Sequence, residues 1–217
     1  MPICTYYFTV LIVVFLPVAV RINSHPNPLE RAMTQTCANL RLRPFTLNDI
    51  AAFTEAVNAS LESLLPWMVW AHADYQPHEA ESWIRFTHWQ RLKGEAEEFA
   101  IVDQRDRLLG GAGIRFARHP GDFSALGYWV RSDAQRQGIA SRAVIALLSL
   151  GFSRPETRGI EILAAEDNLA SRAVAEKCGG EFIGCRYGLI VLESGPVNSA
   201  IYHFQRPDAT GSSPLTG

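Results

Sequence analysis

A short segment between a predicted strand and a predicted helix has the composition of an anion-binding loop. The segment, QRQGIAS at residues 135–141, contains two Gln, one Arg and one Gly. The first backbone N–H groups of a helix have no partner within the helix, and the helix dipole adds partial positive charge there. Gly138 lets the backbone come close to a ligand, and Arg136 offers a charge-assisted contact. The segment therefore predicts a phosphate-binding site.

Two common phosphate-binding motifs are absent from the sequence. It contains no GxxxxGK[ST] segment, and no GxGxxG follows its first predicted strand. These are the signatures of P-loop NTPases and of dinucleotide-binding folds, so neither class is favoured. In this loop, Ile139 and Ala140 are expected to begin the buried face of the following helix.

The spacing Gln135-x-x-Gly138-x-Ala140 resembles the [QR]-x-x-G-x-[GA] loop of the GNAT superfamily of N-acetyltransferases, which holds the diphosphate of acetyl-CoA. Further segments resemble its Rim-type subgroup of ribosomal-protein N-terminal acetyltransferases, namely LRLRPFTLNDI, LLPWMVW, LGYWV and EDNLASRAVAEKCGG. The resemblance covers residues 40–206. It implies an α/β fold with a mixed, mostly antiparallel sheet flanked by helices, whose fourth and fifth strands splay apart.

The same resemblance implies a set of contacts with acetyl-CoA. The splayed strands correspond to residues 126–130 and 159–165, and the pantetheine arm is expected between them. A backbone N–H near Val130 is expected to stabilise the oxyanion of the reaction. The expected cofactor-binding residues are Trp129, Val130, Gln135, Arg136, Gln137, Gly138, Ile139, Ala140, Ser141 and Asn168. From local sequence alone, a cap of the following helix is the better explanation for Asn168, whereas the whole segment DNLASRAVAEK favours the cofactor contact.

Two residues are candidates for proton transfer. In the family pattern, Ser171 occupies a position where relatives place a hydroxyl near the thioester sulfur, although a Ser in a first helical turn also commonly bonds the nearby backbone. Relatives often carry a Glu two residues before GYW, where this chain has Ala125. We therefore name Glu161 on the next predicted strand as the candidate base, with Glu98, His72 and Asp74 as alternatives.

An aromatic segment, LLPWMVWAHADY, is the candidate wall for the amine acceptor, with Trp67, Trp70 and His72 as its substrate-binding residues. Packing within the domain is an equally good explanation for the two Trp side chains. At pH 7 an α-amine with a pKa near 8 is about one tenth neutral, whereas a Lys side chain is neutral to only about four parts in ten thousand. Because this chain lacks the Glu that relatives often carry at position 125, an α-amine is favoured as the acceptor over a Lys side chain.

Three functions are compatible with these features. The first is an acetyl-CoA-dependent N-acetyltransferase that acts on a protein N-terminal amine by direct attack in a ternary complex. The second is an acetyltransferase for a small amine, such as an antibiotic or a metabolite. The third is an acyl-CoA-binding module without transfer activity, which the Ala at position 125 keeps open.

The elements around these residues follow from hydrophobic periodicity and turn signals. Strands are expected at 40–43, 98–103, 108–116, 124–130, 159–165, 181–187 and 200–205. Helices are expected to run from Thr46 as cap to about Asn58, and over 78–93, 138–152 and 169–178. Ala80, Trp83 and Phe86 recur at helical spacing in the second of these. Strands followed by alternating strands and helices indicate an α/β domain with a mixed sheet.

Composition excludes other classes of function. A net charge of −2 gives no cationic field of the kind that nucleic-acid-binding proteins use. The cysteines, Cys4, Cys37, Cys178 and Cys185, form no CxxC pair and have no His at metal-ligand spacing, so we expect no metal site and no disulfide framework. Cys178 and Cys185 are expected to be small core residues.

The ends of the chain differ from its centre. Residues 1–39 form an N-terminal extension whose apolar start resembles a signal peptide or a short anchor, although no Lys or Arg precedes the apolar run. We favour translation from Met33, because acetyl-CoA is an intracellular donor. A cytoplasmic enzyme without a membrane partner, acting as monomer or homodimer, is the expectation. Residues 207–217 are expected to be a disordered tail after an acetyltransferase domain at 40–206.

Overall fold

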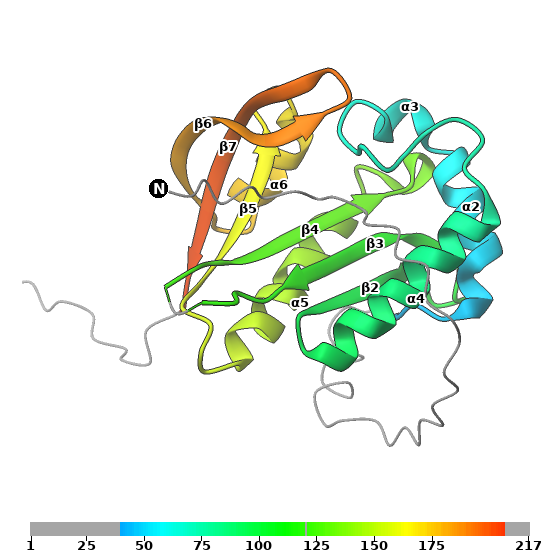
Figure 1. The fold of residues 1–217 in the computed structure, drawn as a ribbon, viewed down its shortest axis with the longest axis horizontal. Coiled ribbons are helices and arrows are strands. Elements are labelled where there is room, and N and C mark those ends of the chain that lie inside the picture. Colours follow the sequence, from blue (N-terminus) through cyan, green and yellow to red (C-terminus); the bar gives the residue numbers. More distant parts are fainter. Residues whose placement is uncertain (1–39, 120, 207–217) are drawn as a thin grey trace, which may run out of the picture.

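The computed structural model describes residues 40–119 and 121–206. Within this part, seven strands form one open sheet in the order β1-β2-β3-β4-β5-β7-β6 (Figure 1). The strands are β1 (Arg41–Pro44), β2 (Ala96–Val102), β3 (Leu108–Arg115), β4 (Ser124–Val130), β5 (Gly159–Ala165), β6 (Glu181–Leu192) and β7 (Gly195–Gln205). All neighbouring strands are antiparallel except β4 and β5, which are parallel. The predicted mixed, mostly antiparallel α/β fold is confirmed.

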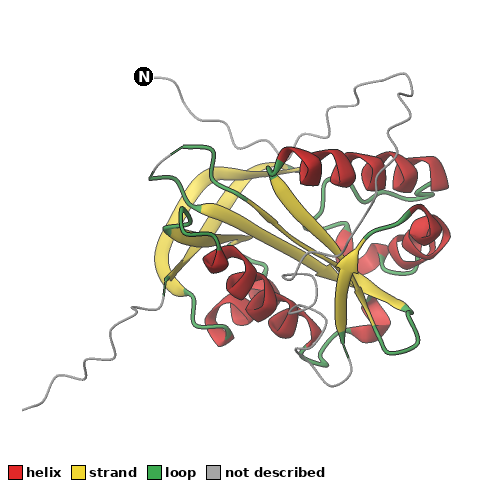
Figure 2. Cartoon of the chain, turned by 90° about the horizontal axis from the view of Figure 1, so that it is seen from below, coloured by secondary structure: helices red, strands yellow, loops and turns green. Residues whose placement is uncertain are grey.

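Helices cover both faces of the sheet (Figure 2). They are η1 (Leu47–Asp49), α2 (Ile50–Asn58), α3 (Leu61–Leu64), α4 (Pro77–Lys93), η2 (Ser132–Ala134), α5 (Ile139–Ser153) and α6 (Leu169–Lys177). One buried cluster joins α2 and α4 to the sheet through residues such as Phe53, Ile84 and Val102. A second, larger cluster joins α5 to the opposite face through residues such as Leu147 and Ile160. We call the face of the sheet that α2 and α4 cover the α4 face, and the face that α5 covers the α5 face.

The observed elements follow the predicted ones closely but differ at two places. The last two strands are longer than expected and continue through a hairpin, because the segment between them, GLIVLESGPVNS, extends both strands. In α4 the buried side chains are Ala80, Ile84, Thr87 and Gln90, whereas Phe86 is exposed. The stripe Ala80, Trp83 and Phe86 is therefore not the buried face of this helix.

The N-terminal extension and the C-terminal tail lie outside the described residues, and so do the expectations attached to them, including the start at Met33. Among residues 40–119 and 121–206, no helix combines the length and apolarity that a membrane crossing needs.

The pairing of β4 with β5 is short. Only Ser124 with Ile160 and Ala125 with Glu161 are in register. Beyond Ala125 the two strands diverge, as Figure 1 shows, while β4 stays paired with β3 and β5 stays paired with β7 along its whole length. The predicted splay of the fourth and fifth strands is therefore confirmed, and it opens the sheet at its centre.

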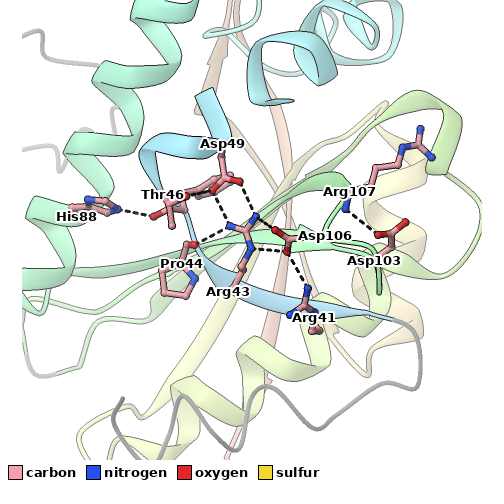
Figure 3. A network of polar contacts seen from close by, with 10 residues as sticks. Arg41, Arg43, Pro44, Thr46, Asp49, His88, Asp103, Asp106 and Arg107 are labelled. Atoms are coloured by element: carbon pink, nitrogen blue, oxygen red, sulfur yellow. Dashed lines mark hydrogen bonds and ion pairs between the residues drawn. The ribbon is translucent and has the colours of Figure 1, made fainter. Parts of the chain in front are cut away.

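A polar network fixes the start of α2 to the sheet (Figure 3). The Arg43 guanidinium on β1 donates to both carboxylate oxygens of Asp49, at 2.7 and 2.8 Å. The Thr46 backbone N–H donates to the same carboxylate at 2.7 Å. Arg43 also contacts Asp106, which lies in the turn between β2 and β3. One guanidinium thus holds both the start of α2 and the turn between β2 and β3. Burial alone would raise the pKa of Asp49, but the hydrogen bond and charge of Arg43, together with the bond from Thr46, outweigh it and lower this pKa.

Replacing Asp49 with Asn tests this network. We expect Asp49→Asn to lower the free energy of unfolding at pH 7 by about 2 kcal/mol, since charge-assisted hydrogen bonds are lost. The stabilisation is present above the unfolded carboxyl pKa of about 3.9 and is lost as pH falls toward the lower folded value. Urea unfolding of both proteins at pH 7 and pH 3 should therefore give a smaller difference at pH 3. Asp106→Asn, at a more exposed position, should show a weaker effect; equal losses would contradict this assignment.

Candidate active site

The loop before α5 has the backbone shape of an anion site. Gly138 is the N-cap of α5 with φ of 72°, and Arg136 is also left-handed with φ of 60°. Left-handed residues in a turn direct successive N–H groups into a common concavity. The Arg142 N–H makes the first helical bond, to the Gly138 carbonyl at 3.1 Å. The N–H groups of residues 139–141 therefore precede the helical ladder and are directed toward the loop.

The side chains of this loop are used partly within the protein. Gln135 Nε2 donates to the Val130 carbonyl at 3.1 Å and to Ser63 Oγ at 3.2 Å. The Gln135 side chain thus ties the loop to the end of β4 and to α3. The backbone N–H of Gln135 also bonds within the protein, because it donates to the Ser132 carbonyl at 3.4 Å. Gln137 remains near the surface beside Asp133, whose carbonyl accepts from its Nε2 at 3.5 Å.

A shallow pocket of about 410 Å³ lies beside the N-terminus of α5. Arg142 and Lys177 give it positive charge, which suits the charge of a nucleotide phosphate. Its lining residues are Leu40, Leu42, Gln137, Gly138, Ser141, Arg142, Ile145, Ala146, Lys177 and Cys178.

The end of β4 directs backbone groups into the opening between β4 and β5. The Arg131 N–H donates to the Leu109 carbonyl on the β3 side at 2.9 Å. Because antiparallel strands bond through alternate residues, the N–H groups of Tyr128 and Val130 are directed away from β3, toward β5. The Trp129 side chain faces the α4 face, where its ring centroid lies 5.5 Å from that of Phe53.

The start of α6 lies on the α5 face of this opening. Asn168 Oδ1 accepts from the Ser171 N–H at 3.0 Å, so Asn168 caps the helix through its oxygen and not through its amide nitrogen. Ser171 Oγ lies 3.1 Å from the Tyr128 hydroxyl, which also donates to the Ser171 carbonyl at 3.1 Å. Burial raises the pKa of Tyr128 to about 12, so it stays protonated. Sequence analysis missed Tyr128, although strand alternation places it on the α5 face.

Glu161 lies on the α4 face of the same opening. It pairs with Ala125, at the last position where β4 and β5 are in register. Its side chain is 14% exposed, and burial, with a smaller contribution from Asp122, raises its pKa. His203 Nε2 lies 4.0 Å from Glu161 Oε2. Burial lowers the pKa of His203, so both groups are biased toward their neutral forms and their contact is not a strong ion pair.

Sequence analysis did not identify His203, whose only signal was its position in an alternating strand. Its ring stacks on Phe123 with centroids 4.1 Å apart. A pocket of about 370 Å³ includes Glu161 and His203 in its lining and is walled mainly by apolar residues of β5, β6 and β7. Its lining residues are Glu161, Leu163, Ile183, Gly184, Cys185, Arg186, Leu189, Ile201 and His203.

The aromatic segment after α3 lies on the α4 face, and its members behave differently. The Trp70 ring packs on Phe53, Tyr75 and Trp129, with centroid distances of 5.9 to 6.3 Å. Trp70 therefore has a packing role and also adjoins the end of β4. Trp67 is half-buried outside this ring cluster. His72 is exposed and contacts Glu79 at 2.8 Å; bonding to the Ala73 carbonyl and to Glu79 raises its pKa.

The two described cysteines are free and differ in burial. Cys178 is half-buried against the buried cluster on the α5 face, and burial raises the pKa of its thiol. Cys185 is exposed beside Glu166, so its prediction as a core residue is wrong; β6 is an edge strand, and one of its sides has no neighbour in the described sheet. The residues that the structure describes contain no group of three or more His, Cys, Asp or Glu able to hold a metal ion.

These groups surround one opening from two faces. Backbone amides at the start of α5, the amides of β4 and the Ser171 hydroxyl lie on or next to the α5 face, and the Glu161 carboxylate lies on the α4 face. Amide donors stabilise negative charge on phosphate or on an oxyanion, a hydroxyl protonates a leaving group and a carboxylate accepts a proton. The arrangement is suited to acyl transfer between two substrates that enter from different sides.

Comparison with known proteins identifies the family. The family model of the acetyltransferase (GNAT) domain matches residues 39–181. No curated protein sequence matches the chain. Many solved structures share its fold.

Three of them illustrate the likeness. A proposed ribosomal-protein-serine acetyltransferase from Vibrio cholerae is 26% identical, with a TM-score of 0.69 over 78% of this chain and 95% of that one. The microcin C7 self-immunity acetyltransferase MccE, in complex with acetyl-CoA and AMP, is 18% identical, with a TM-score of 0.74 over 81% and 99%. RimL, a ribosomal L7/L12 α-N-protein acetyltransferase in complex with coenzyme A, is 22% identical, with a TM-score of 0.72 over 79% and 97%.

With the family model covering well over half of its residues and the predicted splayed sheet present, the chain belongs to the GNAT family and is an acetyl-CoA-dependent acetyltransferase.

Proposed function

We propose that the protein acetylates the α-amine of a protein N-terminus in the cytoplasm. The observation that carries this proposal is the opening between β4 and β5, which has the amides at the start of α5 on one side and the Glu161 carboxylate on the other. A donor and an acceptor can then meet in a ternary complex without a covalent enzyme intermediate. The names of two similar proteins, one acting on ribosomal-protein serine and one on an α-amine, agree with this class of acceptor.

In the proposed complex, the diphosphate of acetyl-CoA lies on the amides of residues 137–141, near the Arg136 guanidinium. Together the two left-handed residues and the N-terminus of α5 supply the positive potential for it. The pantetheine arm runs along Trp129 and Val130, where β4 lacks a neighbour on the β5 side. Asn168 contacts this arm through its amide nitrogen while its oxygen caps α6.

The proposed reaction moves two protons. The acceptor ammonium first loses a proton to Glu161, and the neutral amine attacks the thioester carbon. As the C–N bond forms, the carbonyl oxygen becomes an oxyanion that accepts a hydrogen bond from the Val130 N–H. The C–S bond then breaks, and the thiolate takes a proton from Ser171, whose hydroxyl recovers one from the second N–H proton of the acceptor through water. Tyr128 positions the Ser171 hydroxyl through their 3.1 Å contact.

The first prediction concerns the acceptor. Peptides with a free N-terminus should be acetylated at least tenfold faster at pH 7 than N-blocked peptides that contain Lys, because far more of an α-amine is neutral at this pH. Thiol release from acetyl-CoA measures both rates, and mass spectrometry locates the acetyl group. A preference for the Lys peptides, or for small amines over all peptides, would contradict the proposal.

A second prediction concerns the loop before α5. A β-branched residue at Gly138 strains its left-handed backbone, which costs about 1 to 2 kcal/mol and turns the amides away. Gly138→Val should therefore weaken coenzyme A binding, measured by calorimetry, by about tenfold or more. Gly94→Val is the matched control. Gly94 is the C-cap of α4, has a φ of 68° and has similar open space around its Cβ position, but it lies outside the loop before α5. Equal affinities of the two variants would refute the loop assignment.

The third prediction concerns Glu161. Glu161→Gln should lower kcat at pH 7 by about 100-fold or more, in the range for loss of a general base. Because burial raises the carboxyl pKa, kcat of the natural protein should fall as pH drops through that raised value, since the protonated acid accepts no proton. The variant should lack this acidic limb. Glu156→Gln, in an exposed turn, should keep both rate and pH profile.

A further inference from the structure

The Glu98 side chain lies over a bare part of the sheet on the α4 face. Glu98 on β2 is in register with Gly113 on β3. A Cβ atom at Gly113 would overlap both Glu98 carboxylate oxygens, so the carboxylate occupies the space that any other side chain would fill. Only Gly at this position permits the carboxylate to lie flat across β3.

The next strand continues this bare surface toward the opening. Gly113 is in register with Gly127 on β4. Gly127 is exposed although β4 is a central strand, and no heavy atom lies within 4 Å of the position where its Cβ would be. Open space therefore lies over Gly127, which is the neighbour in register of the Gly113 position that the Glu98 carboxylate covers. A ligand entering from the α4 face meets backbone there instead of side chains.

The distance from the Glu98 carboxylate to the opening between β4 and β5 indicates which group could lie between them. Neighbouring strands are about 4.8 Å apart, so the middle of the β4–β5 opening is about 7 Å from a carboxylate above β3. A hydrogen bond of about 2.9 Å and an attack distance of about 3 to 3.5 Å add up to about 6 Å. This sum is about 1 Å shorter than the span, so an amine nitrogen that contacts the carboxylate would lie about 4 Å from the middle of the opening, close to the attack distance.

We propose that Glu98 is the acceptor-recognition residue, which binds the ammonium group of the incoming substrate above Gly127. This inference rests on the proposed function, in which the acceptor is an α-amine. Glu98 thus selects a cationic amine and holds it between β3 and the opening, and Glu161 on the other side removes the proton. Blocked or neutral N-termini lose this contact.

The charge state of Glu98 agrees with such a role. Burial raises its pKa to about 7, against the opposing effect of Arg115 on β3 and Arg91 on α4 and with a small added effect of Glu97 on its own strand. The carboxylate is therefore ionised mainly above pH 7, whereas an α-ammonium is charged mainly below pH 8. Acceptor affinity should be greatest between these two values. A carboxylate of ordinary pKa would give no fall in affinity between pH 8 and pH 6.

Equilibrium binding tests the inference without requiring turnover. The probes are an alanine tetrapeptide amide with a free N-terminus and its N-acetylated counterpart, each titrated at pH 7.5 into protein saturated with coenzyme A. We expect the free amine to bind the natural protein about tenfold or more tightly than the blocked peptide. Glu98→Gln should reduce this ratio to within about twofold.

Two further variants separate recognition from folding. Gly113→Ala keeps the carboxylate but displaces it, so it should also reduce the ratio. Glu97→Gln is the matched control, because Glu97 is the adjacent residue of β2, on the opposite face, and contacts Arg91 at 2.9 Å. It should keep the ratio. A natural protein that does not discriminate, or a Glu98→Gln variant that keeps tenfold discrimination, overturns the inference.

Kinetics distinguish this inference from the proposed function. In an acetyl-transfer assay, Glu98→Gln should raise the KM for the free peptide about tenfold and leave kcat and the KM for acetyl-CoA within about twofold. A loss of kcat at unchanged KM overturns the recognition role in favour of a base. If the natural protein binds the free amine through Glu98 yet transfers no acetyl group, the proposed function fails and the inference stands. If it transfers the group and Glu98→Gln has no effect, only the inference fails.

Discussion

The structure depends on one constraint, which is that β4 and β5 pair over two positions and then separate. Backbone N–H and C=O groups at the centre of a sheet are normally bonded, and leaving them unpaired away from water is unfavourable. Here each strand has a complete partner on its other side, so β1 to β4 and β5 to β7 are two well-bonded halves. The α5 helix packs on strands of both halves and so bridges the gap between them. In the proposed complex, the pantetheine arm of acetyl-CoA lies between the two strands and bonds the backbone groups of β4 that have no strand partner on the β5 side.

Glycine residues mark the surfaces around this gap where backbone itself meets other groups. Gly138 provides a left-handed turn, after which the N–H groups of residues 139–141 precede the helical ladder of α5. Gly113 leaves room for a carboxylate, and Gly127 leaves a floor without side chains. Gly113 and Gly127 carry no side chain on the α4 face, so the sheet surface beside the Glu98 carboxylate is backbone. The family's usual carboxylate position on β4 holds Ala125, and the neighbour in register on β5 is Glu161.

Much of this arrangement follows from local sequence. Residues 135–141, between an alternating strand and an apolar helix, indicated the loop correctly, since its φ angles and helix start depend on Gly138 and nearby residues. The strands 124–130 and 159–165 were predicted with their observed bounds, because both are short, apolar and bounded by turn residues. Contacts between distant elements were less accessible. The pairs Ser171 with Tyr128 and Glu161 with His203 depend on sheet register, and the position of Glu98 depends on a glycine in the next strand. The exposure of Cys185 depends on which strand lies at the edge.

The ties between α3 and the loop before α5 have a consequence for how the two substrates influence each other. Ser60 Oγ accepts from the Ser132 N–H at 3.0 Å, and Ser63 Oγ contacts both Ser132 Oγ and Gln135 Nε2. The segment that follows α3 carries Trp70, so these polar contacts join the segment proposed to meet the acceptor to the loop proposed to bind the diphosphate. In the proposed ternary complex, a shift of the loop on binding the donor would move the segment that is proposed to meet the acceptor. Linkage then makes the effect reciprocal: the factor by which the donor changes acceptor affinity equals the factor by which the acceptor changes donor affinity.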